Sequence, residues 1–243
     1  MKIIFFVENN HAGGMDSFFT NLINYWPYQN DKLTLICNKS HPGLENIRKS
    51  LIRDCEIIDH SIILNWQLSN KLFGWFPAFI KRSFQPLLKI LLMYYQIKYL
   101  ENLFANLNAD RLMVVNGAYP GGESCRAATI AWSKSNKHKS VHNIRNFAAE
   151  PRFFIKWYEN YIDKKVLNSI KAFIGVSKCC ANSLRVRPVF KDSNRIHHIY
   201  NGTPLDDIDL SYEHEVNLRE KLDIGDDPMC LMLATYELRK GYK

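Results

Sequence analysis

The sequence KIIFFVENNHAGG, residues 2–14, contains a strand, a polar loop and the start of a helix in direct succession. Its first part, Ile3–Val7, is apolar at successive positions, which is typical of a strand covered on both faces in a parallel sheet. Glu8 begins the polar loop at the end of the strand where ligands of open parallel sheets bind. Gly13 and Gly14 then expose backbone N–H groups at a helix N-terminus, where a phosphate binds readily. A glycine turn that serves only strand–helix packing would look the same, so both interpretations stay open at this point.

Short apolar runs and longer helical patterns alternate along most of the chain. The predicted strands are Ile3–Val7, Leu33–Cys37, Cys55–Ile58, Leu112–Val115, Ser140–Ile144, Phe173–Val176 and Ile196–Tyr200. The predicted helices are Met15–Trp26, Leu44–Arg53, Pro86–Asn106, Gly122–Ser135, Phe154–Asn168 and Lys178–Arg187. This order predicts an α/β domain with a doubly wound, Rossmann-like parallel sheet. The dinucleotide fingerprint G-x-G-x-x-G is absent, which disfavours a dehydrogenase.

The composition changes after Gly202, and this change predicts the domain boundary. Residues 1–202 are expected to form the first domain. Residues 203–227 form an acidic, turn-rich linker with a short helix at Leu218–Leu222. The strand Met229–Thr235 then follows, and we interpret residues 228–243 as the truncated start of a second α/β domain.

The overall composition limits the classes of function. Hydrophobic residues make up 47% of the 243 residues, which allows a sizeable core. The net charge of +8 favours an anionic partner, either a phosphate, a nucleic acid or an anionic membrane face. Nucleic-acid binding rests on basicity alone, so we do not expect it. The six cysteines have no C-x-x-C spacing, and we expect no metal. Neither a signal peptide nor an apolar run of ~18 residues is present, so the sequence predicts a cytoplasmic location.

Two further loops follow predicted strands. The loop after Leu112–Val115 contains Gly117, Tyr119, Gly121 and Gly122, and it is suited either to wrapping a ligand or to a tight turn. His142 ends the next strand, where an imidazole can hydrogen-bond a hydroxyl or stabilise developing charge. Taken alone, a histidine at such a position is more often structural.

The stretch His60–Leu100 contains five basic residues and no Asp or Glu. On a helical wheel, the polar side consists of Lys81, Arg82, Gln85, Lys89 and Gln96, opposite Phe84, Leu87, Leu91, Tyr94 and Tyr95. A basic amphipathic helix with aromatic residues binds anionic membrane surfaces. We therefore predict that Lys81, Arg82 and Lys89 face a membrane. The alternative is a helix that packs on the sheet and leaves a solvated basic edge.

Five motifs in order along the chain resemble those of the retaining GT-B glycosyltransferases of family 4. The matching segments are Gly13-Gly14-Met15-Asp16, Ser140-Val141-His142-Asn143, Ile174-Gly175-Val176-Ser177, Ile199-Tyr200-Asn201-Gly202 and Glu237-Leu238-Arg239-Lys240-Gly241. The family commonly has Glu where this chain has Asp16, and often Gly-Arg where this chain has Ala234-Thr235.

The resemblance implies two Rossmann-like domains with the active site between them, of which the first binds the acceptor and the second the nucleotide sugar. It implies that Gly13, Gly14, Arg239 and Lys240 bind the donor phosphates and that His142 contacts the transferred sugar. The acceptor side is implied to be shaped by Asn10 and by the loop residues Gly117, Tyr119, Gly121 and Gly122. Asn201 and Gly202 are implied to form the hinge.

The expected function is transfer of a hexose to a surface glycan or lipid-linked acceptor, with retention of configuration. A UDP- or GDP-linked sugar is the expected donor, and no tightly bound cofactor is expected. The location is expected to be cytoplasmic or peripheral on the inner face of the cytoplasmic membrane. We expect no turnover by these 243 residues alone, because the segment carrying the family's catalytic glutamates is absent. The alternative is a non-catalytic Rossmann-like module that binds a glycan, a lipid or a partner protein.

Overall fold

The structure is a computed structural model that describes residues 1–9, 12–136, 138–202, 218–225 and 227–230. The chain divides into two units, Met1–Gly202 and Thr203–Lys243. In the described part of the second unit, a short helix, α8 (Leu218–Lys221), is followed by a turn. Arg219 closes this turn, because its Nη1 atom donates hydrogen bonds to the carbonyl oxygens of Gly225 and Asp227. Most of the predicted strand Met229–Thr235 lies outside the described residues.

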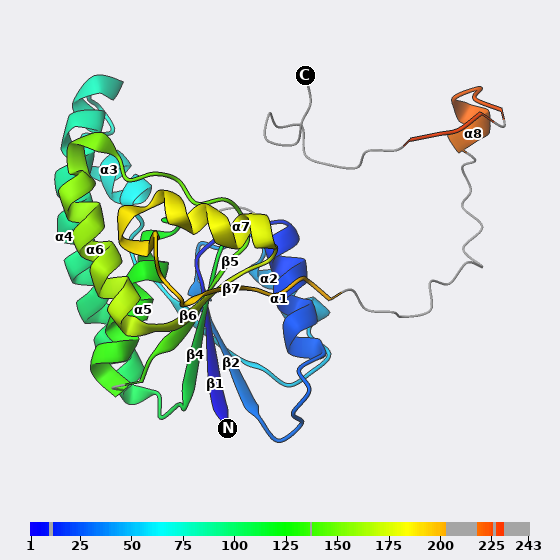
Figure 1. The fold of residues 1–243 in the computed structure, drawn as a ribbon, viewed down its shortest axis with the longest axis horizontal. Coiled ribbons are helices and arrows are strands. Elements are labelled where there is room, and N and C mark those ends of the chain that lie inside the picture. Colours follow the sequence, from blue (N-terminus) through cyan, green and yellow to red (C-terminus); the bar gives the residue numbers. More distant parts are fainter. Residues whose placement is uncertain (10–11, 137, 203–217, 226, 231–243) are drawn as a thin grey trace. The chain divides into compact units, whose positions relative to one another are not determined.

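The first unit contains one parallel seven-stranded sheet with the order β3-β2-β1-β4-β5-β6-β7 (Figure 1). The strands are β1 (Lys2–Val7), β2 (Lys32–Asn38), β3 (Glu56–His60), β4 (Arg111–Asn116), β5 (Ser140–Ile144), β6 (Ile170–Gly175) and β7 (Ile196–His198). All seven predicted strands are present, and the doubly wound class is confirmed. The last strand ends at His198, earlier than predicted. Ile199 and Tyr200 lie beyond it and are exposed.

The helices differ most from the prediction in the crossover between β3 and β4, where the structure has one additional helix and a longer second one. The helices are α1 (Gly14–Asn24), α2 (Leu44–Ser50), α3 (Asn65–Phe73), α4 (Ala78–Asn106), α5 (Glu123–Asn136), α6 (Lys156–Ser169) and α7 (Lys178–Ser183), with 3-10 turns η1 (Phe153–Ile155), η2 (Leu184–Val186) and η3 (Pro188–Phe190). Helix α3 was not predicted. Helix α4 begins at Ala78 and contains Pro86 within it, whereas the prediction placed this proline in the first turn.

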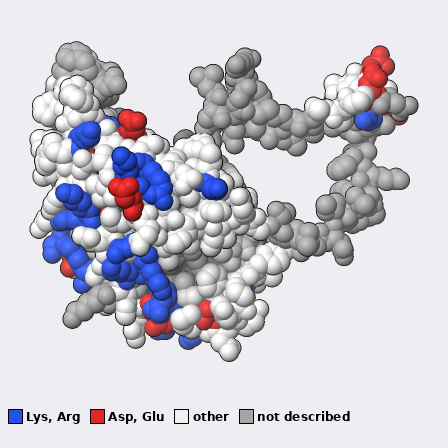
Figure 2. Space-filling model, viewed as in Figure 1, with Lys and Arg blue, Asp and Glu red and all other residues white. Residues whose placement is uncertain are grey.

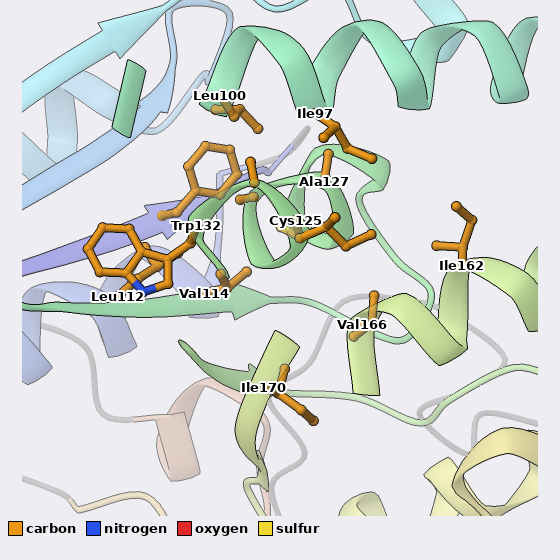
Figure 3. Packing of buried hydrophobic residues seen from close by; sticks show 14 of the residues in the cluster. Ile97, Leu100, Leu112, Val114, Cys125, Ala127, Trp132, Ile162, Val166 and Ile170 are labelled. Carbon is orange, nitrogen blue, oxygen red and sulfur yellow. The ribbon is translucent and has the colours of Figure 1, made fainter. Parts of the chain in front are cut away.

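Two layers of helices cover the two faces of the sheet, with α1 and α2 on one side and α4, α5 and α6 on the other (Figure 1). The alternation of side chains along β1 links both layers to the same strand, because Ile4 and Phe6 join one apolar cluster while Phe5 joins the other. The cluster under α4–α6 is the larger. In Figure 3, Trp132 of α5 lies beside Leu112 of β4.

Candidate functional site

The strand order places the topological switch point between β1 and β4, where the chain leaves the sheet in opposite directions. A pocket of about 460 Å³ lies there, lined by Glu8 after β1 and by Asn116 at the end of β4. Helices α3 and α4 contribute Trp66 and Lys89 to its wall, and Glu123 begins α5 beside it. We call this hollow the switch-point pocket. Its carboxylate, amide, ammonium and indole groups are the kinds that bind saccharides by hydrogen bonds and stacking.

The predicted glycine loop forms one wall of this pocket through Gly117, Gly121 and Gly122. Asn116 holds the loop from within, because its Nδ2 donates to the Pro120 carbonyl oxygen at 3.3 Å and its Oδ1 accepts from the Gly122 N–H at 3.3 Å. Gly121 has a φ of 50°, a conformation that other residues adopt with strain. The loop therefore presents backbone rather than side chains to the pocket.

Tyr119, the remaining predicted loop residue, points away from the pocket into the core and is 0% exposed. Its hydroxyl donates to Asp163 Oδ1 at 2.7 Å. Asp163 Oδ2 in turn accepts from Arg187 Nε at 2.6 Å, and Arg187 Nη2 bonds Glu159 Oε2 at 2.8 Å. These fully buried groups anchor the loop to α6. The placement of Tyr119 does not support contact with an acceptor.

His142 also lies in the core, at 0% exposure, beneath the glycine loop. Its Nδ1 is 3.0 Å from Thr129 Oγ1, and its Nε2 is 3.5 Å from Asn116 Nδ2. Burial lowers the pKa of His142 to about 3, so the imidazole is neutral at ordinary pH. A side chain enclosed in this way does not touch a sugar, so its placement does not support the predicted catalytic contact. His142 instead supports Asn116 from below.

Glu8 is the titratable group at the floor of the pocket. Its Oε2 accepts the Ser124 N–H at 3.0 Å, at the start of α5. Burial raises the pKa of Glu8 to about 7, and the nearby Glu123 carboxylate adds to this, against the Ser124 hydrogen bond and the Arg126 charge. Gly122 is required beside it, because a Cβ at that position would lie 2.9 Å from Glu8 Cδ.

The described part of helix α4 faces the opposite way from the helical-wheel prediction. Lys89 points inward, where its Nζ pairs with Glu123 Oε1 at 2.9 Å and the side chain is only 13% exposed. Gln96 is buried and donates to the Ile63 carbonyl oxygen at 3.2 Å. The outer side is apolar instead, with Phe84, Leu87, Leu91, Tyr94 and Tyr95 exposed. The side chains of Lys81 and Arg82 lie outside the described residues.

A second hollow adjoins the switch-point pocket. It has a volume of about 620 Å³ and lies between the first half of α4 and the turn η1, lined mainly by Pro86, Phe153 and Phe154. We call it the aromatic groove. Lys89 and Arg152 line both hollows, so these two cations stand where the groove meets the pocket. Phe153 and Phe154 are 85% and 88% exposed, which leaves the groove open to the surface.

The predicted phosphate loop lies at the start of α1, where Gly13 and Gly14 are exposed. Asp16 holds the loop, because its Oδ2 accepts the Gly13 N–H at 3.0 Å and its Oδ1 lies 3.0 Å from His41 Nε2. Burial opposes ionisation of Asp16, but the hydrogen bonds from His41 and Gly13 outweigh it and keep the pKa of the carboxyl below its usual value. The Gly13 N–H is therefore already used within the chain, whereas no neighbouring heavy atom comes within 4 Å of a Cβ built on Gly14.

The other predicted site residues lie away from the pocket or outside the described residues. Asn201 is exposed, and its Oδ1 accepts from Arg145 Nη1 at 3.2 Å. Asn10, Arg239 and Lys240 lie outside the described residues. Within the described residues, no three or more His, Cys, Asp or Glu side chains are arranged to hold a metal ion.

The sequence prediction missed Glu8, Lys89 as a pocket residue, and Arg152. Glu8 had a usable signal, because it is the first polar residue after an apolar strand and its position alone places it at the ligand-binding edge. Lys89 and Arg152 had none, since they reach the pocket from a helix and a loop far apart in the sequence.

Fold and site together define a doubly wound α/β unit with a polar pocket at its switch point and glycine loops around it. No family model and no curated protein matches the chain. Among solved structures, the chain is similar to MurG from Acinetobacter baumannii, at 10% sequence identity and a TM-score of 0.46. The match covers 84% of this chain and 47% of the MurG chain, so this chain spans about half the length of that protein. Membership of the family suggested by the five motifs stays a prediction.

Proposed function

We propose that this chain forms the acceptor-binding side of a glycosyltransferase that transfers a hexose from a nucleotide sugar to a lipid-linked saccharide. The observation that carries this proposal is the continuity of the switch-point pocket with the aromatic groove. The polar switch-point pocket, the cations Lys89 and Arg152, and the apolar aromatic groove follow one another in space. A saccharide joined through phosphate to a long hydrocarbon chain has the same three parts in the same order.

The cationic junction supports a phosphate-linked acceptor. Lys89 is paired with Glu123, so its charge is already balanced. Arg152 is exposed, and it has no carboxylate partner among the described residues. A guanidinium binds phosphate oxygens through two parallel N–H bonds, which makes Arg152 the phosphate ligand of this proposal.

The surface around the groove supports contact with a membrane. Trp157 and Tyr161 are exposed on α6, the helix that follows η1, and Leu91 and Tyr94 are exposed on α4. Figure 2 shows more Lys and Arg than Asp and Glu side chains on the helical layer that contains α6. Exposed aromatic residues together with basic residues favour the interface of an anionic bilayer. The described residues contain no helix that meets the length and apolarity of a membrane span. We therefore propose peripheral binding to the inner face of the cytoplasmic membrane.

The donor side of the proposal rests on the exposed glycines at the start of α1. A helix N-terminus attracts the diphosphate of a UDP- or GDP-linked sugar, and Gly14 leaves space for its approach. Arg239 and Lys240 are proposed as further phosphate ligands on the strength of the motif resemblance alone. The resemblance also implies retention of configuration, a point on which the chemistry of Glu8 leads to a different proposal below.

Binding of a lipid-linked sugar tests the acceptor proposal. The probe is glucose joined through a diphosphate to farnesol, compared with free glucose and with farnesyl diphosphate, each titrated by calorimetry in detergent micelles. We expect the joined probe to bind at least tenfold more tightly than either part. Arg152→Gln should weaken binding of both diphosphate probes, whereas Lys134→Gln on the exposed side of α5 should not. Equal affinities for the joined probe and farnesyl diphosphate would contradict a saccharide site.

Vesicle flotation tests the membrane face. Vesicles with about 30% anionic lipid should retain the wild-type chain, and the double substitution Phe153→Ser and Phe154→Ser should release it. The matched control is Ile52→Ser, which removes an exposed apolar side chain distant in sequence from Phe153 and Phe154. Equal release by the control and the double variant would argue against a specific membrane face. Binding of the probe and of vesicles, without binding of any UDP- or GDP-hexose, would favour the alternative, a non-catalytic binding module.

A further inference from the structure

Glu8 combines a position in the switch-point pocket with an unused hydrogen-bonding atom. Its Oε2 is engaged by the Ser124 N–H, which fixes the carboxyl group against the start of α5. Its Oε1 makes no hydrogen bond within the part of the chain that the structure describes. Because Glu8 also lines the pocket, this second oxygen is available to a ligand there.

Charged side chains approach Glu8 from two helices, α5 and α4, and from the loop before η1. Glu123 and Arg126 face it from α5, one raising and the other lowering its pKa. Lys89 of α4 reaches the pocket but is neutralised by Glu123 at 2.9 Å. Arg152 lines the pocket from the loop before η1. No cation lies in hydrogen-bond contact with the Glu8 carboxyl among the described residues, so burial dominates its titration.

A carboxylate that served only as a structural cap would be used up by the Ser124 N–H and would have no need of a second oxygen in the pocket. A carboxylate that serves only to cap a helix N-terminus is stabilised in its ionised form, and its pKa falls. Glu8 caps the Ser124 N–H and yet titrates at about pH 7, because burial outweighs the cap. A carboxyl that is half-ionised near neutral pH and open to a ligand on one side meets the two requirements of a general base.

We propose that Glu8 is the general base of the transfer reaction, accepting the proton of the attacking acceptor hydroxyl on Oε1. This inference rests on the glycosyltransferase function proposed above. In the step, the O–H bond of the acceptor breaks and its proton passes to Glu8. The acceptor oxygen forms the new bond to the anomeric carbon of the donor sugar. The bond from that carbon to the nucleoside diphosphate breaks, and its electron pair leaves on the phosphate oxygen.

A general base at Glu8 determines the anomeric configuration of the product. A base on the acceptor side activates the hydroxyl for direct displacement from the face opposite the leaving group, which inverts the anomeric configuration. The family resemblance implies retention. Glu8 therefore distinguishes this chain from the family that its motifs resemble.

The test uses the pH dependence of acceptor binding to the 243-residue chain. The probe is again glucose joined through a diphosphate to farnesol, titrated by calorimetry at pH 6 and pH 8. If the hydroxyl bonds only to the ionised carboxyl, apparent affinity follows the ionised fraction and rises about tenfold between these pH values. Glu8→Gln should bind with no such rise. Glu45→Gln, which changes an exposed carboxylate of α2 outside the pocket, should keep it.

Deoxy analogues of the probe sharpen the test, because removal of the hydroxyl that contacts Glu8 should abolish the pH response while other deoxy positions keep it. Binding with the same pH response in Glu8→Gln, or with affinity that falls toward pH 8, overturns the general base and leaves the proposed acceptor site intact. Failure of the wild-type chain to bind the probe at both pH values overturns the acceptor site and, with it, this inference. A circular dichroism spectrum unchanged by Glu8→Gln excludes misfolding as the cause of a lost response.

Discussion

Substitution of Glu8 by Gln should stabilise the protein at alkaline pH, although it removes a charged group from a hydrogen bond. The reason is the cost of ionising a half-buried carboxyl that is shielded from water. Burial raises the pKa of Glu8 to about 7 from the ordinary value of 4.5. The folded state therefore holds its proton more tightly than the unfolded chain does. The stabilisation from this preference is complete below pH 4.5 and is lost as the pH rises through 7.

The size of the effect follows from the shift in pKa. A difference of roughly 2.5 pKa units means that about 3 kcal/mol of stability is lost between low pH and pH 8. Less than about 1 kcal/mol of this is already lost at pH 5. Glutamine resembles the protonated carboxyl and keeps an oxygen for the Ser124 N–H, so Glu8→Gln escapes this loss. Weakening of that hydrogen bond affects both pH values equally. The variant should therefore gain about 2 kcal/mol over wild type between pH 5 and pH 8.

Urea unfolding of both proteins at pH 5 and pH 8 measures this gain directly, and thermal unfolding should show a rise of roughly 4–8 °C at pH 8. Glu123→Gln is the control, because it breaks the ion pair with Lys89 and should show no comparable gain. The same free-energy difference between wild type and Glu8→Gln at both pH values would refute the reasoning. It would mean that the carboxyl is solvated in the folded state.

Three further substitutions test the surroundings of the pocket. Arg187→Met should lower the free energy of unfolding by about 3–5 kcal/mol in urea titrations, because it leaves two buried carboxylates without their cation; a loss under about 1 kcal/mol would contradict this. Gly122→Ala should weaken probe binding, because its Cβ would meet Glu8 Cδ at 2.9 Å, whereas the control Gly202→Ala, outside the pocket, meets no heavy atom within 4 Å and should bind like wild type. His142 has a pKa of about 3, so the stability contributed by its neutral imidazole falls as the pH drops below about 6.5. His142→Gln lacks this contribution and should lose about 2 kcal/mol less than wild type between pH 7 and pH 5, measured by urea unfolding.

The sheet was predictable because its strands are apolar at successive positions. Strand β1 buries Ile4 and Phe5 on opposite faces, so neither face needs polar residues, and this pattern is readable in one dimension. The strand ends then place the ligand-binding edge without further information. This is why the pocket lies where the glycine loop Gly117–Gly122 was expected.

The side chains within that edge were less predictable, because their orientation depends on distant partners. The helical wheel placed Lys89 and Gln96 on a polar side that faces a membrane or solvent. The structure instead buries Lys89 and Gln96, since Glu123 and the Ile63 carbonyl oxygen provide them with partners across the fold. His142 likewise finds its partners in other elements. Such pairings follow from tertiary packing and leave no periodic signal.

The unequal size of the two apolar clusters has a consequence for local opening. Segments with fewer buried contacts open at lower free energy, so backbone amides in α1 should exchange with solvent deuterium before those in α5. The exposed glycines at the start of α1 thus belong to the half of the site that opens more readily. An anion bound at Gly14 would draw part of its effect from ordering this half. Its binding would then appear as slower exchange in α1, while exchange in α5 stays unchanged.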